Sequence, residues 1–471
     1  MKTKLVLLLA FLVAHYFTAA WAAEVVIPDA ALKAVIWQTL GKPAPVGILT
    51  EQDMLGLTNL DATSDGIRSL QGLGAAHNLI TLHVASDKLQ FTNLTFPDGL
   101  TNLTTLDLYG AYLTGLTLPA DMISLTTLFL VQNALTNLTL PGLKSLAGLN
   151  LYGNALSSLT LPSDLTNLTA LALEGNKLTS LTLPAGLTNL QNLGLGGNPL
   201  TNLTLPDGLT HLTGLDLDGN LLTDFSFVGD FTTLTYLSLG DTYLTDIPWI
   251  RGLTNIEVIR LYGNGLTSLT LPPGLPSLTT LDLSQNQLTN LTLPAGLTSL
   301  TTLLMDGNQL TSLSLGPGLT NLTTLGLTYG TGINFTLSGD GSHLTALSLQ
   351  GDPLNFRHRA PMMTLTLPLG LSNLTTLNLV ANQLTSLTLP ADLINLTTLD
   401  LSYNQLTSLT FPAGLTNLTT LNFLGNPFQS LVLPEQLAAG ALAATVADLR
   451  VQGVSISIYL PTLRLRLDCS E

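Results

Sequence analysis

A line of about 22 residues recurs through most of this chain. Residues 371–392 read LSNLTTLNLVANQLTSLTLPAD, with leucine at 371, 374, 377, 379, 384, 387 and 389. The pattern L-x-L-x-x-N, or a close variant, ends at residues 65, 87, 111, 133, 154, 176, 198, 220, 242, 264, 286, 308, 330, 352, 382, 404 and 426. Of the 16 steps between these positions, 13 are 22 residues long and the others measure 24, 21 and 30. A unit repeated at this period predicts a solenoid, in which each coil buries its leucines against its neighbours.

Each repeat has two halves. In the first half, TTLNL around Leu377 and Leu379 alternates apolar and polar residues, as a half-buried strand does. Asn382 follows, and its side chain can satisfy backbone groups in the turn. The second half sends its leucines back inward and ends near Pro390. A proline and β-branched threonines there predict extended segments or short turns instead of regular helices.

These repeats resemble the leucine-rich repeat family, and their length is most similar to the bacterial, internalin-like branch, over residues 57–433. The resemblance implies an α/β repeat solenoid: a horseshoe or arc of about 17 coils, with a concave parallel β-sheet, a mostly extended or turn-like convex side, and an asparagine ladder between coils. Asn holds 11 of the 17 ladder positions; the others are Asp65, Asp87, Ala111, Thr242, Gly330 and Asp352. The resemblance also implies a protein ligand bound on the concave sheet.

The N-terminus is not part of the repeat. Residues 1–22 begin with Lys2 and Lys4, continue with an apolar stretch and end in small residues around Ala22. This order predicts a cleaved signal peptide, with a short membrane anchor as the alternative. We therefore expect a secreted or cell-surface protein, with the periplasm as another destination.

Caps are expected at both ends of the solenoid. Residues 23–56 are predicted to form a helical N-terminal cap, with a helix that starts near Asp29 and stops at Gly41. Residues 434–471 are predicted to form a C-terminal cap, in which a helix over about 435–450 precedes short strands in VSISIYL and LRLRL.

Composition limits the classes of function. The hydrophobic fraction is 45% and the mean hydropathy is +0.42, but Thr, Asn and Gly interrupt every apolar run beyond the first two dozen residues. We therefore expect no membrane span. The net charge of −15 without a basic cluster argues against nucleic acid as a partner. The single cysteine, Cys469, excludes an internal disulfide.

No cluster of catalytic residues is visible. The six histidines are scattered, and HExxH, GxSxG and P-loop motifs are missing from the sequence, so we expect no enzyme, no catalytic residue and no cofactor. Asp216 and Asp218, with Asp241 nearby, could supply oxygens to Ca²⁺. An exposed acidic patch is the plainer alternative, so no metal site is predicted.

The outward positions of the strands change from repeat to repeat, while the leucines barely change. We predict that these positions bind a protein partner, because exposed aromatic residues and Arg often anchor interfaces. The first candidate patch is Tyr109, Phe129, Val131, Asn150, Tyr152 and Glu174; the second is Asp216, Asp218, Tyr236, Arg260 and Tyr262. An insertion at 356–363 adds Arg357, His358 and Arg359, either as a contact loop or as a tolerated insertion.

Three alternatives stay open. Ranks of threonine on successive coils could bind a polysaccharide or ice, although Thr is also a common strand former. The chain could also be a non-catalytic structural protein of a cell surface. Eleven N-x-[ST] sequons, ten of them NLT, could accept glycans, but TNLT is also the ordinary wording of the repeat.

Overall fold

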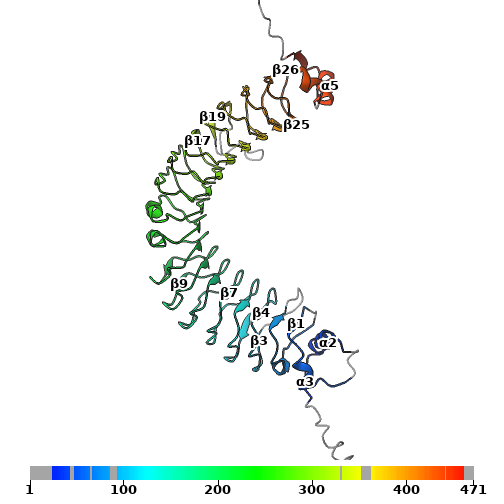
Figure 1. Ribbon diagram of the computed structural model, residues 1–471, viewed down its shortest axis with the longest axis vertical. Coiled ribbons are helices and arrows are strands. Elements are labelled where there is room, and N and C mark those ends of the chain that lie inside the picture. The colour runs from blue at the N-terminus through cyan, green and yellow to red at the C-terminus, as the bar shows by residue number, and fades with distance from the viewer. Residues whose placement is uncertain are drawn as a thin grey trace, which may run out of the picture. The chain divides into compact units, whose positions relative to one another are not determined.

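The computed structural model describes residues 24–42, 47–63, 66–84, 93–328, 331–351, 362–440 and 442–460. The chain divides into two compact units. In each of them, short strands and loops are stacked in sequence order (Figure 1). Unit 1 comprises Met1–Leu215 and Asn220–Leu222, and unit 2 comprises Asp216–Gly219 and Thr223–Glu471.

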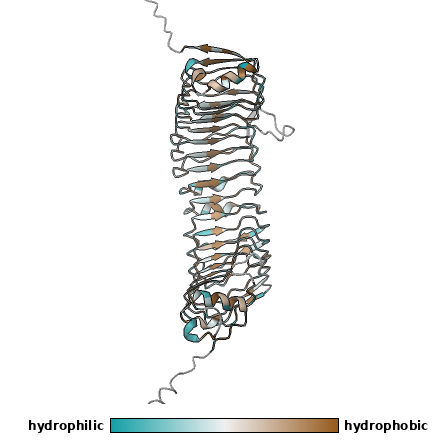
Figure 2. Ribbon diagram, turned by 90° about the vertical axis from the view of Figure 1, so that its right-hand side faces the viewer, coloured by the Kyte–Doolittle hydropathy of each residue, from teal (hydrophilic) through white to brown (hydrophobic). Residues whose placement is uncertain are grey.

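Short parallel strands, one from each repeat, form what we call the strand face. In unit 1 they are β1 (Asn59–Asp61), β2 (Thr81–His83), β4 (Thr105–Asp107), β6 (Thr127–Phe129), β7 (Gly148–Asn150), β8 (Ala170–Ala172) and β10 (Asn192–Gly194). In unit 2 they are β13 (Tyr236–Ser238), β14 (Val258–Arg260), β15 (Thr280–Asp282), β16 (Thr302–Leu304), β18 (Thr324–Gly326), β20 (Ala346–Ser348), β22 (Thr376–Asn378), β23 (Thr398–Asp400) and β25 (Thr420–Asn422). β12 (Gly214–Asp216) lies at the border of the two units in the sequence. Figure 2 shows these strands side by side within each unit.

The register of the strand face repeats without slippage. Leu377 pairs with Leu399, and Leu281 pairs with Leu303, so the same column of the repeat meets itself on the next turn. All four leucines are fully buried. The predicted fold class is therefore confirmed in each unit: a parallel-strand solenoid with little helix, whose core is a stack of equivalent leucines.

The return half of each repeat is extended, as the sequence predicts, with short strands and few helical turns. The return strands are β3 (Asn93–Thr95), β5 (Gly115–Thr117), β9 (Ser180–Thr182), β11 (Asn202–Thr204), β17 (Leu310–Leu315), β19 (Thr331–Gly339), β21 (Thr364–Thr366), β24 (Ser408–Thr410) and β26 (Ser430–Pro434). The 3-10 helices are η1 (Leu73–Ala75), η2 (Ser226–Asp230) and η3 (Pro248–Gly252). η2 and η3 occur where the LTLP wording is replaced by FSFVGD and IPWIRG, and they bury Val228 and Ile250 in the place of leucines.

The asparagine ladder is a hydrogen-bonded column under the strand face. In unit 2, the Asn264 side-chain amide donates to the carbonyls of Leu239 (2.7 Å) and Leu261 (3.0 Å), and its oxygen accepts the Leu244 N–H (2.9 Å). In unit 1, Asn176 bonds in the same way and is 6% exposed. Each asparagine thus satisfies buried backbone groups of two neighbouring turns. Ladder positions 65, 87, 330 and 352 lie outside the described residues.

Helices lie near both ends of the described chain. α2 (Ala30–Thr39) begins at Asp29, whose carboxylate accepts the Leu32 N–H (2.9 Å) and also the Arg68 N–H of the first turns (2.6 Å). α3 (Glu51–Met54) begins with a capping box at Thr50. Among the described residues, no helix has the length and apolar character needed to span a bilayer.

The C-terminal end differs from the single helix expected over 435–450. It contains α4 (Glu435–Ala439) and α5 (Ala443–Val451), because the chain breaks at Gly440. β27 (Ser455–Tyr459) then pairs with β26. The LRLRL segment lies outside the described residues.

Candidate binding face

The first candidate patch is assembled on the strand face of unit 1. Phe129 pairs in register with Asn150 on the neighbouring strand. Tyr109 and Tyr152 follow their strands by two residues and are 52% and 45% exposed. The backbone N–H of Gly153 donates to the Glu174 carbonyl (2.9 Å), which places Tyr152 and Glu174 on adjacent turns.

Glu174 is the least solvated member of this patch. A Cβ added to Gly194 would meet its carboxylate, so the side chain lies over that glycine. Its Oε2 is buried and has no hydrogen-bond partner among the described residues. This burial raises the pKa of the Glu174 carboxyl above its ordinary value.

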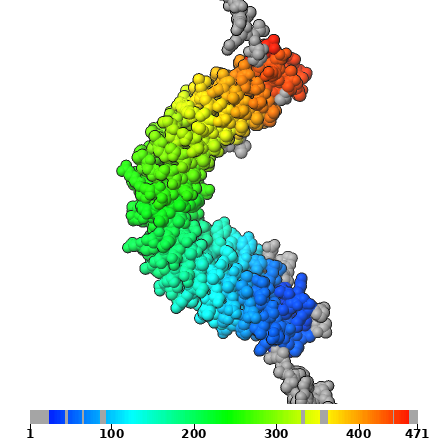
Figure 3. Space-filling model, viewed as in Figure 1, coloured from blue at the N-terminus to red at the C-terminus, as the bar shows by residue number. Residues whose placement is uncertain are grey.

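The second candidate patch is assembled in unit 2. The Arg260 guanidinium stacks on the Tyr236 ring, 5.6 Å from its centroid, and Nη1 donates to the tyrosine Oη (3.3 Å). Tyr262 Oη donates to Asp218 Oδ2 (2.7 Å), and the Asp218 N–H donates to Asp216 Oδ1 (2.9 Å). The five predicted residues therefore form two connected groups on the same face. Figure 3 shows that neighbours along each unit are neighbours in space, as such a patch requires.

The Tyr262 side chain is fixed on this surface by its hydrogen bond to Asp218. Burial raises its pKa first, followed by the hydrogen bond to Asp218 and the nearby charges of Asp218, Asp241 and Asp216. Its phenol therefore stays protonated and keeps its hydrogen bond throughout the neutral range.

Three exposed tyrosines were not among the predicted residues: Tyr112, Tyr243 and Tyr403, the last of which is 56% exposed and precedes the ladder residue Asn404. Tyr112 is 54% exposed and Tyr243 is 77% exposed, and both adopt the left-handed conformation, with φ of 54° and 61°. Each directly follows a ladder position without asparagine, Ala111 or Thr242. In the sequence, a tyrosine directly after a ladder position without asparagine could have identified both residues. Such a backbone is costly for a bulky residue, which marks these turns as functional candidates.

Asp306 is a further strand-face residue, at a variable outward position of the repeat but outside the two predicted patches. Its carboxylate accepts the Thr328 N–H of the next turn (2.5 Å) and lies close to Gly326. Burial raises the pKa of the Asp306 carboxyl. Asp306 in unit 2 and Glu174 in unit 1 are therefore both strand-face carboxyl groups whose pKa is raised by burial.

One rank of threonines is used inside the protein. The Thr301 hydroxyl donates to the Thr279 carbonyl (3.1 Å), and Thr323 donates in turn to Thr301 (3.2 Å). The same bond recurs at Thr104, Thr126, Thr169, Thr213, Thr279, Thr345, Thr375, Thr397 and Thr419. This rank cannot offer its hydroxyl hydrogens to ice or a polysaccharide while it holds neighbouring turns together.

Six of the eleven sequon asparagines form a second, outer ladder. The Asn417 amide donates to the Ile394 carbonyl of the preceding turn (2.8 Å), and Asn167 donates to the Lys144 carbonyl (2.8 Å). Asn102, Asn321, Asn373 and Asn395 do the same. These bonds give the six asparagines a structural reason to recur.

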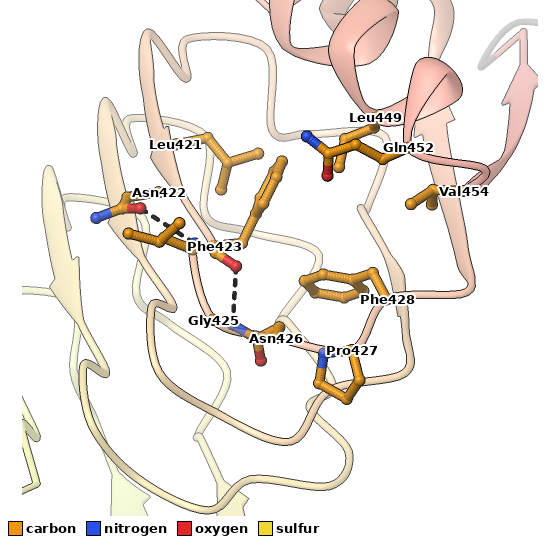
Figure 4. A pocket seen from close by; sticks show the side chains of 11 residues that line it. Leu421, Asn422, Phe423, Gly425, Asn426, Pro427, Phe428, Leu449, Gln452 and Val454 are labelled. Carbon is orange, nitrogen blue, oxygen red and sulfur yellow. Dashed lines mark hydrogen bonds between the residues drawn. The ribbon is translucent and has the colours of Figure 1, made fainter.

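A cavity of about 340 Å³ opens at the last turn of the strand face. Figure 4 shows Phe423 and Phe428 inside it, with Leu449 and Gln452 of the α5 region on the opposite side. The two rings meet edge to face at 5.6 Å. Phe423 is only half-buried, whereas the equivalent Leu401 one turn earlier is fully buried, because no further strand-face strand follows β25 among the described residues.

The insertion residues and the acidic residues considered for Ca²⁺ are the remaining predictions. Arg357, His358 and Arg359 of the insertion lie outside the described residues. Within the described ranges, no group of three or more His, Cys, Asp or Glu side chains is placed to hold a metal ion.

Comparisons with known proteins agree with this geometry. The sequence profile described as "Leucine Rich repeats (2 copies)" matches residues 188–229, 254–295 and 394–435. No curated protein matches the chain closely enough to count as a relative.

Several solved structures are similar to this chain, and two of them share its fold with TM-scores of at least 0.50. A leucine-rich repeat protein of Leptospira interrogans is 25% identical, with a TM-score of 0.52, over 86% of this chain and 97% of its own. YopM of Yersinia enterocolitica is 23% identical, with a TM-score of 0.50, over 90% and 98%. An internalin of Listeria monocytogenes is 21% identical, with a TM-score of 0.40, over 93% and 98%.

The matched repeats and the observed solenoid confirm the recognition made from the sequence: residues 188–229, 254–295 and 394–435 match leucine-rich repeats, and the described residues fold as a parallel-strand solenoid of that type. This fold is a scaffold for protein interactions, and leucine-rich repeat proteins are typically binding proteins without catalytic activity.

Proposed function

We propose that this protein is a secreted or cell-surface binding protein that recognises a protein partner through its strand face. The observation that carries the proposal is the exposure of Tyr109 and Tyr152 on a rigid frame of buried leucines. Tyrosines held in this way supply large contact area at a small entropic cost. We propose no catalytic role.

The variable residues support the same surface. Arg260 is exposed, and its stacking on Tyr236 fixes the direction of its guanidinium. A pre-ordered Arg beside an aromatic ring is a common interface anchor, because little side-chain entropy is lost on binding.

A capture experiment tests the strand face. The full-length protein is immobilised and exposed to extracts from its natural surroundings, and bound proteins are identified by mass spectrometry. Tyr152→Ala combined with Arg260→Ala should lower capture of a specific partner by about tenfold or more, as expected for two interface anchors. The melting temperature should not change, because neither side chain fills the core.

A matched pair controls for the loss of charge and apolar area. Leu369, 75% exposed, and Arg251, in η3, both lie away from the strand face. Leu369→Ala with Arg251→Ala should capture the partner as the wild type does. If the strand-face pair also captures normally, the strand-face assignment is wrong.

Export is supported by the signal sequence predicted in residues 1–22. N-terminal sequencing of protein collected from the medium or the cell surface should begin near residue 23. A protein that stays in the cytoplasm with residue 1 intact would refute this part of the proposal.

A further inference from the structure

The strand face of unit 2 ends at β25 with an open edge. β25 pairs with β23, and no further strand-face strand follows it among the described residues. In the preceding turn, the Leu401 N–H donates to the Asn422 carbonyl (2.7 Å), and the Tyr403 N–H also donates to the turn of β25 (2.6 Å). The equivalent N–H groups of that last turn belong to Phe423 and Gly425, and neither has an acceptor among the described residues. Such an edge can take one more strand.

The core beneath this edge is also incomplete. Leu421, Phe423 and Phe428 are half-buried, whereas the equivalent leucines of the preceding turn are fully buried. The cavity of about 340 Å³ lies against these three side chains, with Leu449 of α5 on its opposite side (Figure 4). The last turn therefore lacks the inward apolar side chains that a following turn supplies elsewhere in the solenoid.

A segment with the right pattern follows the described chain at this end of unit 2. Residues 461–467 read PTLRLRL, and T-L-R-L repeats the T-L-x-L wording of strand-face strands such as β23 and its turn, TLDL. β27 pairs with the return strand β26, so the segment starts from the return side of the last turn. Packed sheets lie about 10 Å apart and seven extended residues span about 23 Å, so the segment can reach β25.

We infer that residues 462–467 add to the open edge of β25 as a further strand and place their leucines in the cavity. The carbonyl groups of this strand would accept the N–H groups of Phe423 and Gly425, as each following turn does elsewhere in the unit. The inference goes beyond the proposed function and does not rest on it.

The alternation of the segment decides which side chains enter the cavity. Successive side chains of a strand point to opposite faces, so Leu463 and Leu465 would point inward together while Arg464 and Arg466 point outward. The reverse arrangement would bury two guanidinium groups against phenylalanine rings without an anionic partner, which is costly. In the inferred arrangement the strand face ends in two positive charges, on a chain whose net charge is −15.

The attachment of the segment favours it over a strand from a second copy of the protein. A segment tethered a few residues from its binding edge has an effective concentration on the order of millimolar. A second copy is present only at its concentration in solution. An edge filled from within the chain also prevents copies from joining edge to edge.

Hydrogen exchange of the purified full-length protein tests the inference, because no other protein is present to cover the edge. Deuterium uptake by the Phe423 and Gly425 amides is compared between the wild type and Leu463→Asp with Leu465→Asp. Carboxylates are disfavoured in an apolar cavity, so the variant segment should leave the edge. Both amides should then exchange about tenfold faster or more.

A matched pair of substitutions controls for changes to the same segment. Arg464→Ser with Arg466→Ser alters only the outward side chains and should leave both exchange rates unchanged. The Leu401 and Tyr403 amides, which are bonded to the last turn, should exchange equally in all three proteins. Unchanged Phe423 and Gly425 rates in the leucine pair, or an equal acceleration in the arginine pair, would overturn the inference.

Dilution separates the chain's own segment from a second copy. Protection by the attached segment should not change when the protein is diluted about tenfold, whereas protection by a second copy should fall by mass action. Protection that falls on dilution would therefore overturn the inference. Each of these results leaves the strand-face proposal to its own capture experiment, because Tyr152 and Arg260 lie in other turns.

Discussion

Tyr152 in unit 1 and Tyr262 in unit 2 occupy the same column of the repeat, yet they lie differently. Tyr152 stands 45% exposed, between turns that carry Val131 and Glu174 in that column. Tyr262 lies down over Gly240 and bonds to Asp218. The residue at the same position of the preceding turn thus decides how an outward tyrosine lies. Beside a larger side chain the ring is exposed, whereas beside Gly240 the ring packs over the glycine. The frame beneath is the same in both units, and the predictions below test that contrast.

The largest effect is expected from the shared core. Leu149→Ala in unit 1 and Leu379→Ala in unit 2 each remove a leucine that is no more than 2% exposed. Both should lower the free energy of unfolding by about 2–5 kcal/mol through an unfilled cavity. Urea denaturation measures the change, and Leu369→Ala on the surface should stay within about 0.5 kcal/mol of the wild type. A clear cost in one unit only would show that the two frames are not equivalent.

The two asparagine ladders should differ in strength. Asn264→Ala leaves buried carbonyls and an N–H of Leu244 without partners, and should cost about 1–3 kcal/mol. Asn417→Ala in the outer ladder exposes its carbonyl partner to water, and should cost about 0.5–1 kcal/mol. The same urea titrations measure both. Equal costs would mean that burial does not set the value of these bonds.

Gly240→Ala should make Tyr262 in unit 2 more exposed, as Tyr152 is in unit 1. The new Cβ would displace the Tyr262 ring and break its bond to Asp218, at a cost of about 1 kcal/mol. The pKa of Tyr262 should then fall toward its ordinary value, as followed by NMR of ring-labelled tyrosine. Gly265→Ala is the control, because its Cβ would meet neighbours only at 3.5 Å. An unshifted Tyr262 in Gly240→Ala would contradict this account of the column.

The smallest effect concerns the buried carboxylate of unit 1. The pKa of Glu174 is raised in the folded state, so ionisation of this group destabilises the fold. Below the ordinary glutamate pKa of 4.5, the carboxyl is protonated in both the folded and the unfolded state, and no stability is lost. As the pH rises from 4.5 through the raised pKa of the folded state, the wild type loses stability. Glu174→Gln should therefore be slightly more stable than the wild type at pH 7 and equal to it at pH 3–4. Thermal unfolding at both pH values checks this, and a variant less stable at pH 7 would refute it.

The sequence predicts the repeated parts well, because one physical rule acts in every turn. Alternating leucines such as Leu377 and Leu379 define the strand, and an asparagine such as Asn382 defines the ladder. The outer ladder through Asn417 was not predicted, because the sequence alone does not show which group an exposed polar side chain in a turn will bond to. The orientation of the Tyr262 side chain was not predicted, because it depends on the space left by Gly240 in the preceding turn. The helix break at Gly440 depends on packing in the cap, where no repeat exists to guide the prediction.

Oxidative footprinting of the protein, alone and with its captured partner, tests the central claim most directly. Hydroxyl radicals modify exposed Tyr109 and Tyr152 on the strand face, and also exposed Met363 next to the return strand β21. We expect the partner to protect both tyrosines and to leave Met363 as reactive as before. Protection of Met363 with both tyrosines still reactive would place binding on the return side and contradict the account.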